Sequence, residues 1–231
     1  MMELIRVAAT TIDISLSESD YQYFLTLLPE EKRKRVLNFH FRADAFRSIL
    51  GEILLRYQLK EYYGINEYQT AVTAKGKPFM VYPDNIKYNI SHSGSWVICA
   101  ISKMDIGIDV ECVSGQQSLD DMEQISPYFM IGEELRAIKH FQKEERLERY
   151  FYFWTMREAF VKCTGEGIDM LKKNQYSLSG NYETVYRNER YIFKELPFQK
   201  NYKLAICMKG EADVQEVEYV NIQKLLEMGR T

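Results

Sequence analysis

Two carboxylates face the same side of one predicted strand. The segment IGIDVE, residues 106–111, alternates in side-chain direction if it is extended, so Asp109 and Glu111 point one way beside Gly107 and the three branched aliphatic residues point the other. Two neighbouring negative charges on an otherwise apolar strand repel each other unless a cation lies between them. The spacing alone favours a hard-metal site and an exposed polar face of an edge strand equally.

A second group of charges lies in the segment WTMREAFVK. Glu158 and Lys162 are four residues apart, and therefore on one face of a helix, with Arg157 adjacent. This spacing is more often that of a surface ion pair. The rest of the helix is aromatic and apolar, however, which leaves little of it to face water and favours a functional position.

Two turns carry groups that suit phosphate. In NISHSG, His92 stands between two hydroxyls just beyond a predicted strand end, and a glycine follows that allows close backbone approach. In KGKP, Lys77 precedes Pro78 in a cationic turn. Each motif alone is commonly structural: NISHSG as a turn that contains a histidine, and KGKP as a solvated loop.

Composition restricts the class of protein. The 231 residues include 30 Lys and Arg and 33 Asp and Glu, giving a net charge of −3, and 46% are hydrophobic. These values are ordinary for a soluble globular protein and lack the basic excess of nucleic-acid binders. No apolar run is long enough to span a bilayer, and the opening residues make a poor signal peptide. We expect a cytoplasmic protein that binds neither nucleic acid nor membrane.

Cysteine and histidine usage bears on the metal. The four cysteines are far apart, with no CxxC pair, and three of them lie in apolar surroundings that favour buried free thiols. Only three histidines are present. A bound divalent ion would therefore be held by carboxylates, which points to Mg²⁺ or Mn²⁺ rather than zinc.

The elements that must position these residues alternate between strands and helices. Apolar residues at helical spacing predict an amphipathic helix in ADAFRSILGEILLRYQLKEYY, and a second helix is predicted in ERYFYFWTMREAFVKCTG, ended by Gly165 and Gly167. Strands are predicted at 4–14, 71–73, 86–91, 96–102 and 105–112, and in several later segments from NQYSLSG to VQEVEYV. The fold class is α+β, with a boundary between two lobes near 103–105.

Taken together in chain order, these motifs resemble those of the 4′-phosphopantetheinyl transferases of the surfactin-synthetase-activating type. The resemblance rests on GKP, NISHSG, GIDVE and WTMREAFVKCTG, and it extends from about Leu28 to Gly167. It implies two similar, pseudo-twofold related lobes, each a small antiparallel sheet with a packed helix. We expect lobes at 1–104 and 105–231, the last strand and helix being able to pack back on the first lobe.

The resemblance also implies a reaction and roles. A monomeric enzyme would move the phosphopantetheine arm of coenzyme A, its substrate, to a serine of an apo acyl or peptidyl carrier protein. Asp109, Glu111 and Glu158 match the ligands of Mg²⁺, with Mn²⁺ as an alternative ion. The residues matched to coenzyme A are Arg47, Lys77, Pro78, Ser91, His92, Arg157 and Lys162. Catalytic roles fall to Lys162, His92 and Glu133, the last as general base, with Glu134 one step away.

The sequence departs from the family pattern at two places, and one alternative function is considered. Arg157 stands where lysine is commoner in the family, and FMIGEE differs from the usual pattern around the general base. The rival is a catalytically silent module that binds coenzyme A or a nucleotide for regulation. Such a module would be expected to have lost an acid, whereas Asp109, Glu111 and Glu158 are all present.

Overall fold

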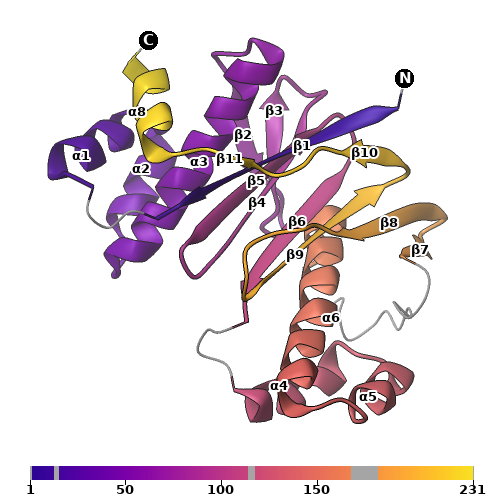
Figure 1. Cartoon of the computed structure of the whole chain (residues 1–231). Coiled ribbons are helices and arrows are strands. Elements are labelled where there is room, and N and C mark those ends of the chain that lie inside the picture. Colours follow the sequence, from indigo (N-terminus) through magenta and orange to yellow (C-terminus); the bar gives the residue numbers. More distant parts are fainter. Residues whose placement is uncertain (1, 13–15, 114–117, 168–181, 231) are drawn as a thin grey trace.

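Two larger sheets, each backed by one long helix, and one two-stranded sheet build the described part of the protein (Figure 1). The computed structural model describes residues 2–12, 16–113, 118–167 and 182–230. The strands are β1 (Glu3–Thr11), β2 (Gln69–Val72), β3 (Pro78–Tyr82), β4 (Lys87–Ser93), β5 (Trp96–Ser102), β6 (Ile106–Cys112), β7 (Glu183–Tyr186), β8 (Glu189–Glu195), β9 (Tyr202–Lys209), β10 (Ala212–Val214) and β11 (Glu218–Tyr219). The helices are α1 (Glu18–Thr26), α2 (Glu30–Leu37), α3 (Arg42–Tyr63), α4 (Leu119–Ile125), the 3-10 helix η1 (Ser126–Tyr128), α5 (Gly132–Ile138), α6 (Lys143–Thr164) and α8 (Ile222–Arg230).

The two lobes repeat one plan, which confirms the predicted α+β fold. In the first lobe β1 pairs with β5 and β5 with β4, and α3 covers one face. In the second lobe β6 pairs with β9 and β9 with β8, and α6 covers one face. All of these pairings are antiparallel. In both lobes a strand, a long helix and a hairpin follow each other along the chain.

The C-terminal segment returns to the first lobe. Strands β10 and β11 pair with β1 in the parallel direction, which makes the first sheet mixed rather than purely antiparallel. Helix α8 packs against α3, and its Leu225 and Leu226 are buried. The carboxylate of Glu218 accepts hydrogen bonds from the hydroxyls of Tyr57 and Tyr62. The chain therefore crosses between the sheets twice, before β6 and after β9.

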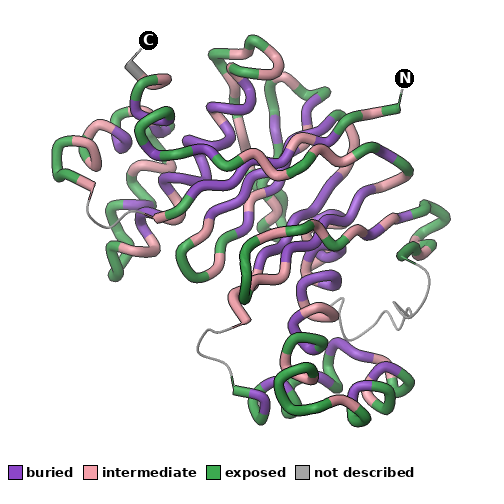
Figure 2. The backbone as a smooth tube through the Cα atoms, viewed as in Figure 1, coloured by how far each residue is buried: buried purple, intermediate pink, exposed green. Residues whose placement is uncertain are grey.

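Buried residues lie mainly along the strands and the long helices (Figure 2). Their apolar side chains form three layers between these elements. One layer lies between α3 and the first sheet and another between the second sheet and α6. The middle layer joins the two sheets, with Ile5, Val7 and Ile98 from the first and Ile108 and Ile206 from the second. Because the middle layer draws on both lobes, the boundary between them is itself a hydrophobic core.

Strand β6 has the two faces that its alternation predicts. Ile106, Ile108 and Val110 are buried in the middle layer. On the opposite face, a Cβ atom added at Gly107 would lie 2.1 Å from the carbonyl oxygen of Ala159 and 2.3 Å from the backbone nitrogen of Cys163. Glycine at this position therefore lets α6 lie directly against β6, on the side that carries the acids.

The predicted long helices are confirmed, with adjusted ends. The apolar positions of α3 are buried, and α3 ends at Gly64 in the left-handed conformation (φ 65°). Helix α6 ends likewise at Gly165 (φ 70°) but begins at Lys143, earlier than predicted. Both ends follow from the freedom of glycine at positive φ. Cys99, Cys163 and Cys207 are buried and free, as predicted.

Several strand predictions need correction. Strand β4 runs on through His92 to Ser93, so His92 lies within the strand and not beyond its end. Strand β3 is absent from the sequence prediction. It begins at Pro78 of the KGKP turn and forms a hairpin with β2. The VQEVEYV segment contributes to the separate strands β10 and β11. The predicted strand at 174–180 and the end of the first predicted strand, 13–14, lie outside the described residues.

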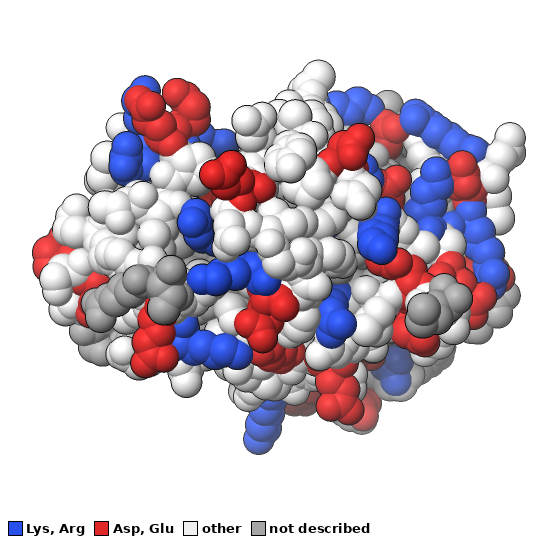
Figure 3. All heavy atoms as spheres, turned by 90° about the horizontal axis from the view of Figure 1, so that it is seen from above, with Lys and Arg blue, Asp and Glu red and all other residues white. Residues whose placement is uncertain are grey.

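The surface agrees with the near-neutral charge. Basic and acidic side chains are interspersed over the face seen from above (Figure 3). Among the described helices, none combines the length and the apolar character that crossing a membrane requires.

Candidate active site

Three acids approach one another where α6 crosses the acidic face of β6. Asp109 is buried at 2% exposure, and Glu111 and Glu158 are half-buried. The Nζ atom of Lys162 lies 2.5 Å from Oδ1 of Asp109 and 3.0 Å from Oγ of Ser91. The structure thus brings together five residues predicted from separate motifs, including Ser91 from the neighbouring strand β4.

Burial raises the pKa of all three carboxyl groups, and repulsion by neighbouring acids adds to this effect for Glu111 and Glu158. Desolvation, and then the charges of Asp109 and Glu111, raise the pKa of Glu158 to about 7. Desolvation and the charge of Asp109 raise the pKa of Glu111. Burial also raises the pKa of Asp109, against the opposing effect of the Lys162 ammonium. Positive charge delivered to this cluster would therefore be strongly favourable.

The acids fit a divalent cation by chemistry and by unused oxygens. Oδ2 of Asp109 and Oε1 of Glu158 are buried without a hydrogen-bond partner. Carboxylate oxygens are the ligands that Mg²⁺ and Mn²⁺ prefer. Within the described residues, no three His, Cys, Asp or Glu side chains already stand in a metal-holding arrangement. The oxygen donors for a divalent ion are thus present, and the Lys162 ammonium lies against one oxygen of Asp109.

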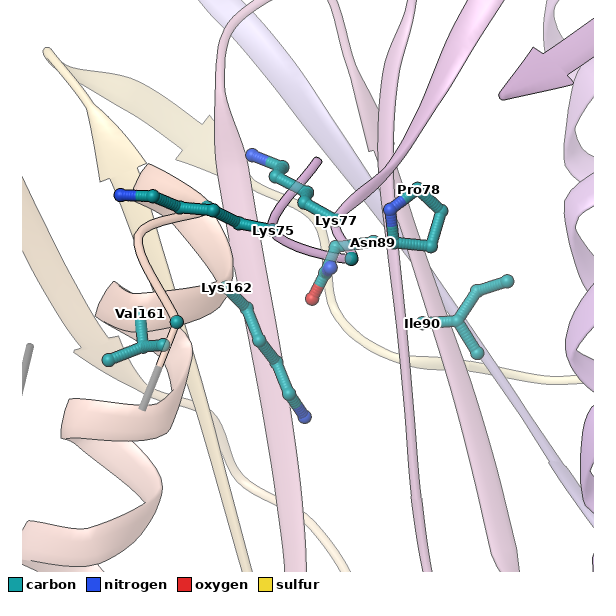
Figure 4. Close-up of a pocket in the computed structure, with 10 residues that line it drawn as sticks. Lys75, Lys77, Pro78, Asn89, Ile90, Val161 and Lys162 are labelled. Carbon is teal, nitrogen blue, oxygen red and sulfur yellow. The ribbon is translucent and has the colours of Figure 1, made fainter. Parts of the chain in front are cut away.

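A pocket of about 240 Å³ opens beside this cluster, between the β2–β3 turn and the C-terminal end of α6 (Figure 4). Lys75, Lys77 and Lys162 line it, together with Pro78 and Asn89. The ammonium group of Lys77 donates to the carbonyl oxygen of Cys163, near the end of α6. Three cations around one pocket make it suited to an anionic ligand.

Arg47 and His92 lie beside this cationic region on the first lobe. Arg47, on α3, donates from Nε and Nη2 to the carbonyl oxygen of Gly94, at 3.2 and 2.9 Å. His92 is exposed to solvent on β4. Partial desolvation, followed by the charges of Lys162 and Arg47, lowers the pKa of His92. Its imidazole therefore lies within the field of two cations of this region.

Arg157 does not reach the cleft. It is 1% exposed and donates from Nη2 to both oxygens of Glu134, at 3.1 and 2.8 Å. Oε2 of Glu134 also accepts from the backbone N–H of Ile131, which caps α5. The pair fixes α5 against α6. Arg157, predicted to bind coenzyme A, and Glu134, the alternative base, are thus both committed to a buried ion pair.

Glu133 remains accessible. It lies exposed in the first turn of α5. Among the hydrogen bonds and ion pairs of the described residues, none joins it to the three acids. The structure therefore separates two neighbouring glutamates that sequence reasoning left open as candidate bases.

Sequence reasoning missed the donors that hold Glu111. Oγ of Ser93 and Nε1 of Trp154 donate to its two oxygens, at 2.9 and 3.0 Å. The alternation of Asn89, Ser91 and Ser93 along one strand is a local signal that could have placed their side chains on one face. That this face meets β6 is decided by the packing of the lobes.

Comparison with known proteins assigns the chain to a family. Residues 15–104 match the family described as 4′-phosphopantetheinyl transferase, N-terminal, and residues 105–207 match the 4′-phosphopantetheinyl transferase superfamily. The chain belongs to this superfamily and is an enzyme, a transferase of the 4′-phosphopantetheinyl group. The resemblance found in its motifs is thereby confirmed.

Two bacterial relatives match over nearly the whole chain, and a human relative matches over two thirds of it. It is 26% identical to the 4′-phosphopantetheinyl transferase Sfp of Bacillus subtilis (strain 168), over 93% of this chain and 97% of the relative. It is 28% identical to the 4′-phosphopantetheinyl transferase psf-1 of Bacillus pumilus, over 97% of both chains. It is also 30% identical to the human L-aminoadipate-semialdehyde dehydrogenase-phosphopantetheinyl transferase, over 67% of this chain and 53% of that protein.

Proposed function

We propose that this enzyme transfers the phosphopantetheine arm of coenzyme A to a serine of an apo acyl or peptidyl carrier protein, in an Mg²⁺-dependent reaction. The products are the holo carrier and adenosine 3′,5′-bisphosphate. The observation that carries the proposal is the meeting of three acids, two with unpartnered buried oxygens, beside a lysine-lined pocket. Cleavage of a pyrophosphate ester requires both positively charged side chains and a bound divalent cation close to the phosphates.

The bonds that change in this reaction define what the residues must do. The serine oxygen attacks the β-phosphorus of coenzyme A, and the bond from that phosphorus to the bridging oxygen breaks. Adenosine 3′,5′-bisphosphate departs with the electron pair, and the serine proton passes to a base. Held by Asp109, Glu111 and Glu158, Mg²⁺ would neutralise charge on the pyrophosphate.

The side chains of the cleft bind and orient the donor. Lys162 and His92 would contact the pyrophosphate, with the hydroxyl of Ser91. Arg47, Lys77 and Pro78 would hold the nucleotide end, whose 3′-phosphate is anionic. Glu133 would accept the serine proton directly or through water. Arg157 is not retained among these residues, because it is buried against Glu134.

The direct test uses the full chain, coenzyme A, Mg²⁺ and an apo carrier protein, with intact mass as the readout. We expect the carrier to gain the mass of one phosphopantetheine arm. Asp109→Ala should abolish most of this gain while the protein still unfolds cooperatively. Transfer at the wild-type rate in excess chelator, or by this variant, would contradict the metal site.

The same assay tests the alternative function, a catalytically silent regulatory module. That alternative predicts binding of coenzyme A without any change in carrier mass. A panel of fatty-acid, polyketide and peptide-synthetase carriers then identifies which carriers are served. Light scattering on a sizing column tests the expected monomer, and fractionation of cells tests the expected cytoplasmic location.

A further inference from the structure

A row of polar side chains on β4 caps the backbone of β6 across the boundary between the lobes. Asn89, Ser91 and Ser93 alternate along β4 and therefore point to one side. Their side-chain oxygens accept hydrogen bonds from the backbone N–H groups of Ile108, Val110 and Cys112, at 2.8, 3.2 and 3.1 Å. The two strands are thus joined by three hydrogen bonds from side chains to backbone. We call this set of contacts the β4–β6 seam.

The two serines of the seam also reach the acids. Ser91 donates its hydroxyl to Oδ1 of Asp109, and Ser93 donates to Oε2 of Glu111, both at 2.9 Å. Each serine therefore accepts from the residue after an acid and donates to the acid itself. Since the accepted N–H belongs to a rigid strand, the hydroxyl is held in the orientation that serves the carboxylate.

Glu111 is held from both of its oxygens. Ser93 from the first lobe contacts Oε2, and the indole Nε1 of Trp154 from α6 contacts Oε1 at 3.0 Å. Rotation of the carboxylate about its terminal torsion would break both hydrogen bonds. Both donors are neutral, so they fix the orientation of Glu111 while its negative charge stays available for a cation.

We infer that Ser93 and Trp154 are positioning residues that orient Glu111 for the divalent cation, so that cation affinity depends on their two hydrogen bonds to the Glu111 carboxylate. The inference rests on the proposed function, in which Glu111 is a ligand. A carboxylate that is already fixed loses less rotational freedom when it binds an ion. Partners that orient a metal ligand typically contribute about 10–100-fold to metal affinity.

Ser93 is a better position to test than Ser91. Ser91 also accepts from Lys162, so its removal would disturb two partners of Asp109. Asn89 offers a matched control because it makes the same kind of seam hydrogen bond, to Ile108, but contacts none of the three acids. Asn89 lines the pocket, so binding is measured without coenzyme A.

The test measures Mn²⁺ binding to the metal-free full chain by electron paramagnetic resonance. We expect Ser93→Ala and Trp154→Phe each to weaken Mn²⁺ binding about tenfold or more. Ser93→Thr, which keeps the hydroxyl, and Asn89→Ala should stay within about threefold of wild type. Thermal unfolding of the same samples without metal establishes that each variant is folded.

The outcomes separate this inference from the proposed function. Wild-type protein that binds no Mn²⁺ would overturn the metal site and the inference with it. Wild-type binding with unchanged affinity in Ser93→Ala and Trp154→Phe would overturn the inference alone. A loss in Asn89→Ala as large as in Ser93→Ala would also overturn it, because general loosening of the seam would then be the cause. If Ser93→Ala does not fold, Trp154→Phe and Ser93→Thr decide by the same criteria.

Discussion

Glu133 and Glu134 show how two identical neighbours acquire different chemistry. Glu134 lies buried against Arg157, where its charge is neutralised and its oxygens are occupied by the guanidinium and by the N–H of Ile131. Glu133, one residue earlier on α5, faces solvent. The proposed base must be free to approach the serine of a bulky carrier protein, and of these two glutamates only Glu133 is exposed.

The matched substitutions Glu133→Gln and Glu134→Gln should therefore fail in different ways. We expect Glu133→Gln to keep its melting temperature while kcat falls about 10²–10⁴-fold, because the amide cannot accept the proton. Glu134→Gln should lose about 3–5 kcal/mol of stability, since it leaves the Arg157 guanidinium buried without its counter-charge. Urea unfolding and carrier-mass kinetics on both variants give the two readouts.

A near-normal kcat for Glu133→Gln would remove its assignment and leave solvent as the proton acceptor. A stable but inactive Glu134→Gln would contradict the division of roles. Coenzyme A affinity serves as the control, since neither glutamate is expected to contact the donor.

Protons and Mg²⁺ should compete for Glu158. Its pKa of about 7 in the folded protein exceeds the ordinary 4.5, so between these values the folded protein keeps a proton that the unfolded chain has lost. The metal-free protein should therefore lose stability as pH rises from 4.5 to 7. If Glu158 is a ligand of Mg²⁺ as proposed, Mg²⁺ binding displaces this proton and should weaken about tenfold for each pH unit below 7.

Titration calorimetry with Mg²⁺ at several pH values, alongside thermal unfolding in chelator, measures both effects. Glu158→Gln is the control, because it removes the titrating group. Stability that rises between pH 4.5 and 7 in the wild type relative to this control would contradict the prediction.

At the scale of elements, the contact between β6 and α6 decides whether the acids can meet. Gly107 permits this contact, because any side chain there would overlap the backbone of α6 at Ala159 and Cys163. Asp109 on β6 and Glu158 on α6 approach each other only if the two elements touch. The glycine is thus a requirement of the site and not only of the packing.

Gly107→Ala should lower the free energy of unfolding by about 1–3 kcal/mol or more, because the new methyl group overlaps backbone atoms that cannot move separately. Gly132→Ala, in the first turn of α5, should be neutral or stabilise by about 0.5–1 kcal/mol, since alanine restricts the unfolded chain. The nearest atom to its new methyl group is a flexible arginine nitrogen at 3.4 Å. Urea unfolding followed by circular dichroism compares the two variants.

Equal stability of the two alanine variants would mean that α6 shifts easily along β6. In that case the approach of Asp109 to Glu158 would not depend on Gly107. A lower Mn²⁺ affinity in Gly107→Ala than in Gly132→Ala would instead tie the contact to the metal site.

At the scale of the whole molecule, neither lobe has a complete core of its own. The middle layer takes Val7 and Ile98 from the first sheet and Val110 and Leu204 from the second. The first lobe also depends on α8, whose Leu225 is fully buried in the layer beneath α3. The two lobes therefore resemble halves of one folding unit more than separate domains.

We predict that residues 1–104 expressed alone will not unfold cooperatively and will bind a hydrophobic dye, because the middle layer is exposed and α8 is missing. Near-ultraviolet circular dichroism and calorimetry measure this. The control is the full chain cut after folding at a protease site inserted within 103–105, which should remain associated. A sharp, reversible transition in the isolated fragment would contradict the prediction.

What the sequence determined by itself was local or was carried by motifs. The alternation of IGIDVE separated the acids from the apolar face of β6, and apolar spacing with a terminal glycine identified α3 and α6. The ordered set of motifs gave the two-lobed α+β fold and the family. These features depend on side-chain periodicity and backbone freedom, which consecutive residues determine.

What only the tertiary structure decided was which distant residues meet. Arg157 pairs with Glu134 instead of entering the cleft, and Trp154 and Ser93 converge on Glu111 from different lobes. His92 lies within β4 because the β4–β5 hairpin pairs beyond it. Each of these contacts joins segments whose relative positions are set by the packing of α6 and the two sheets. Spacing along the chain constrains neighbours on one element, but the partners across elements are selected by the shared core.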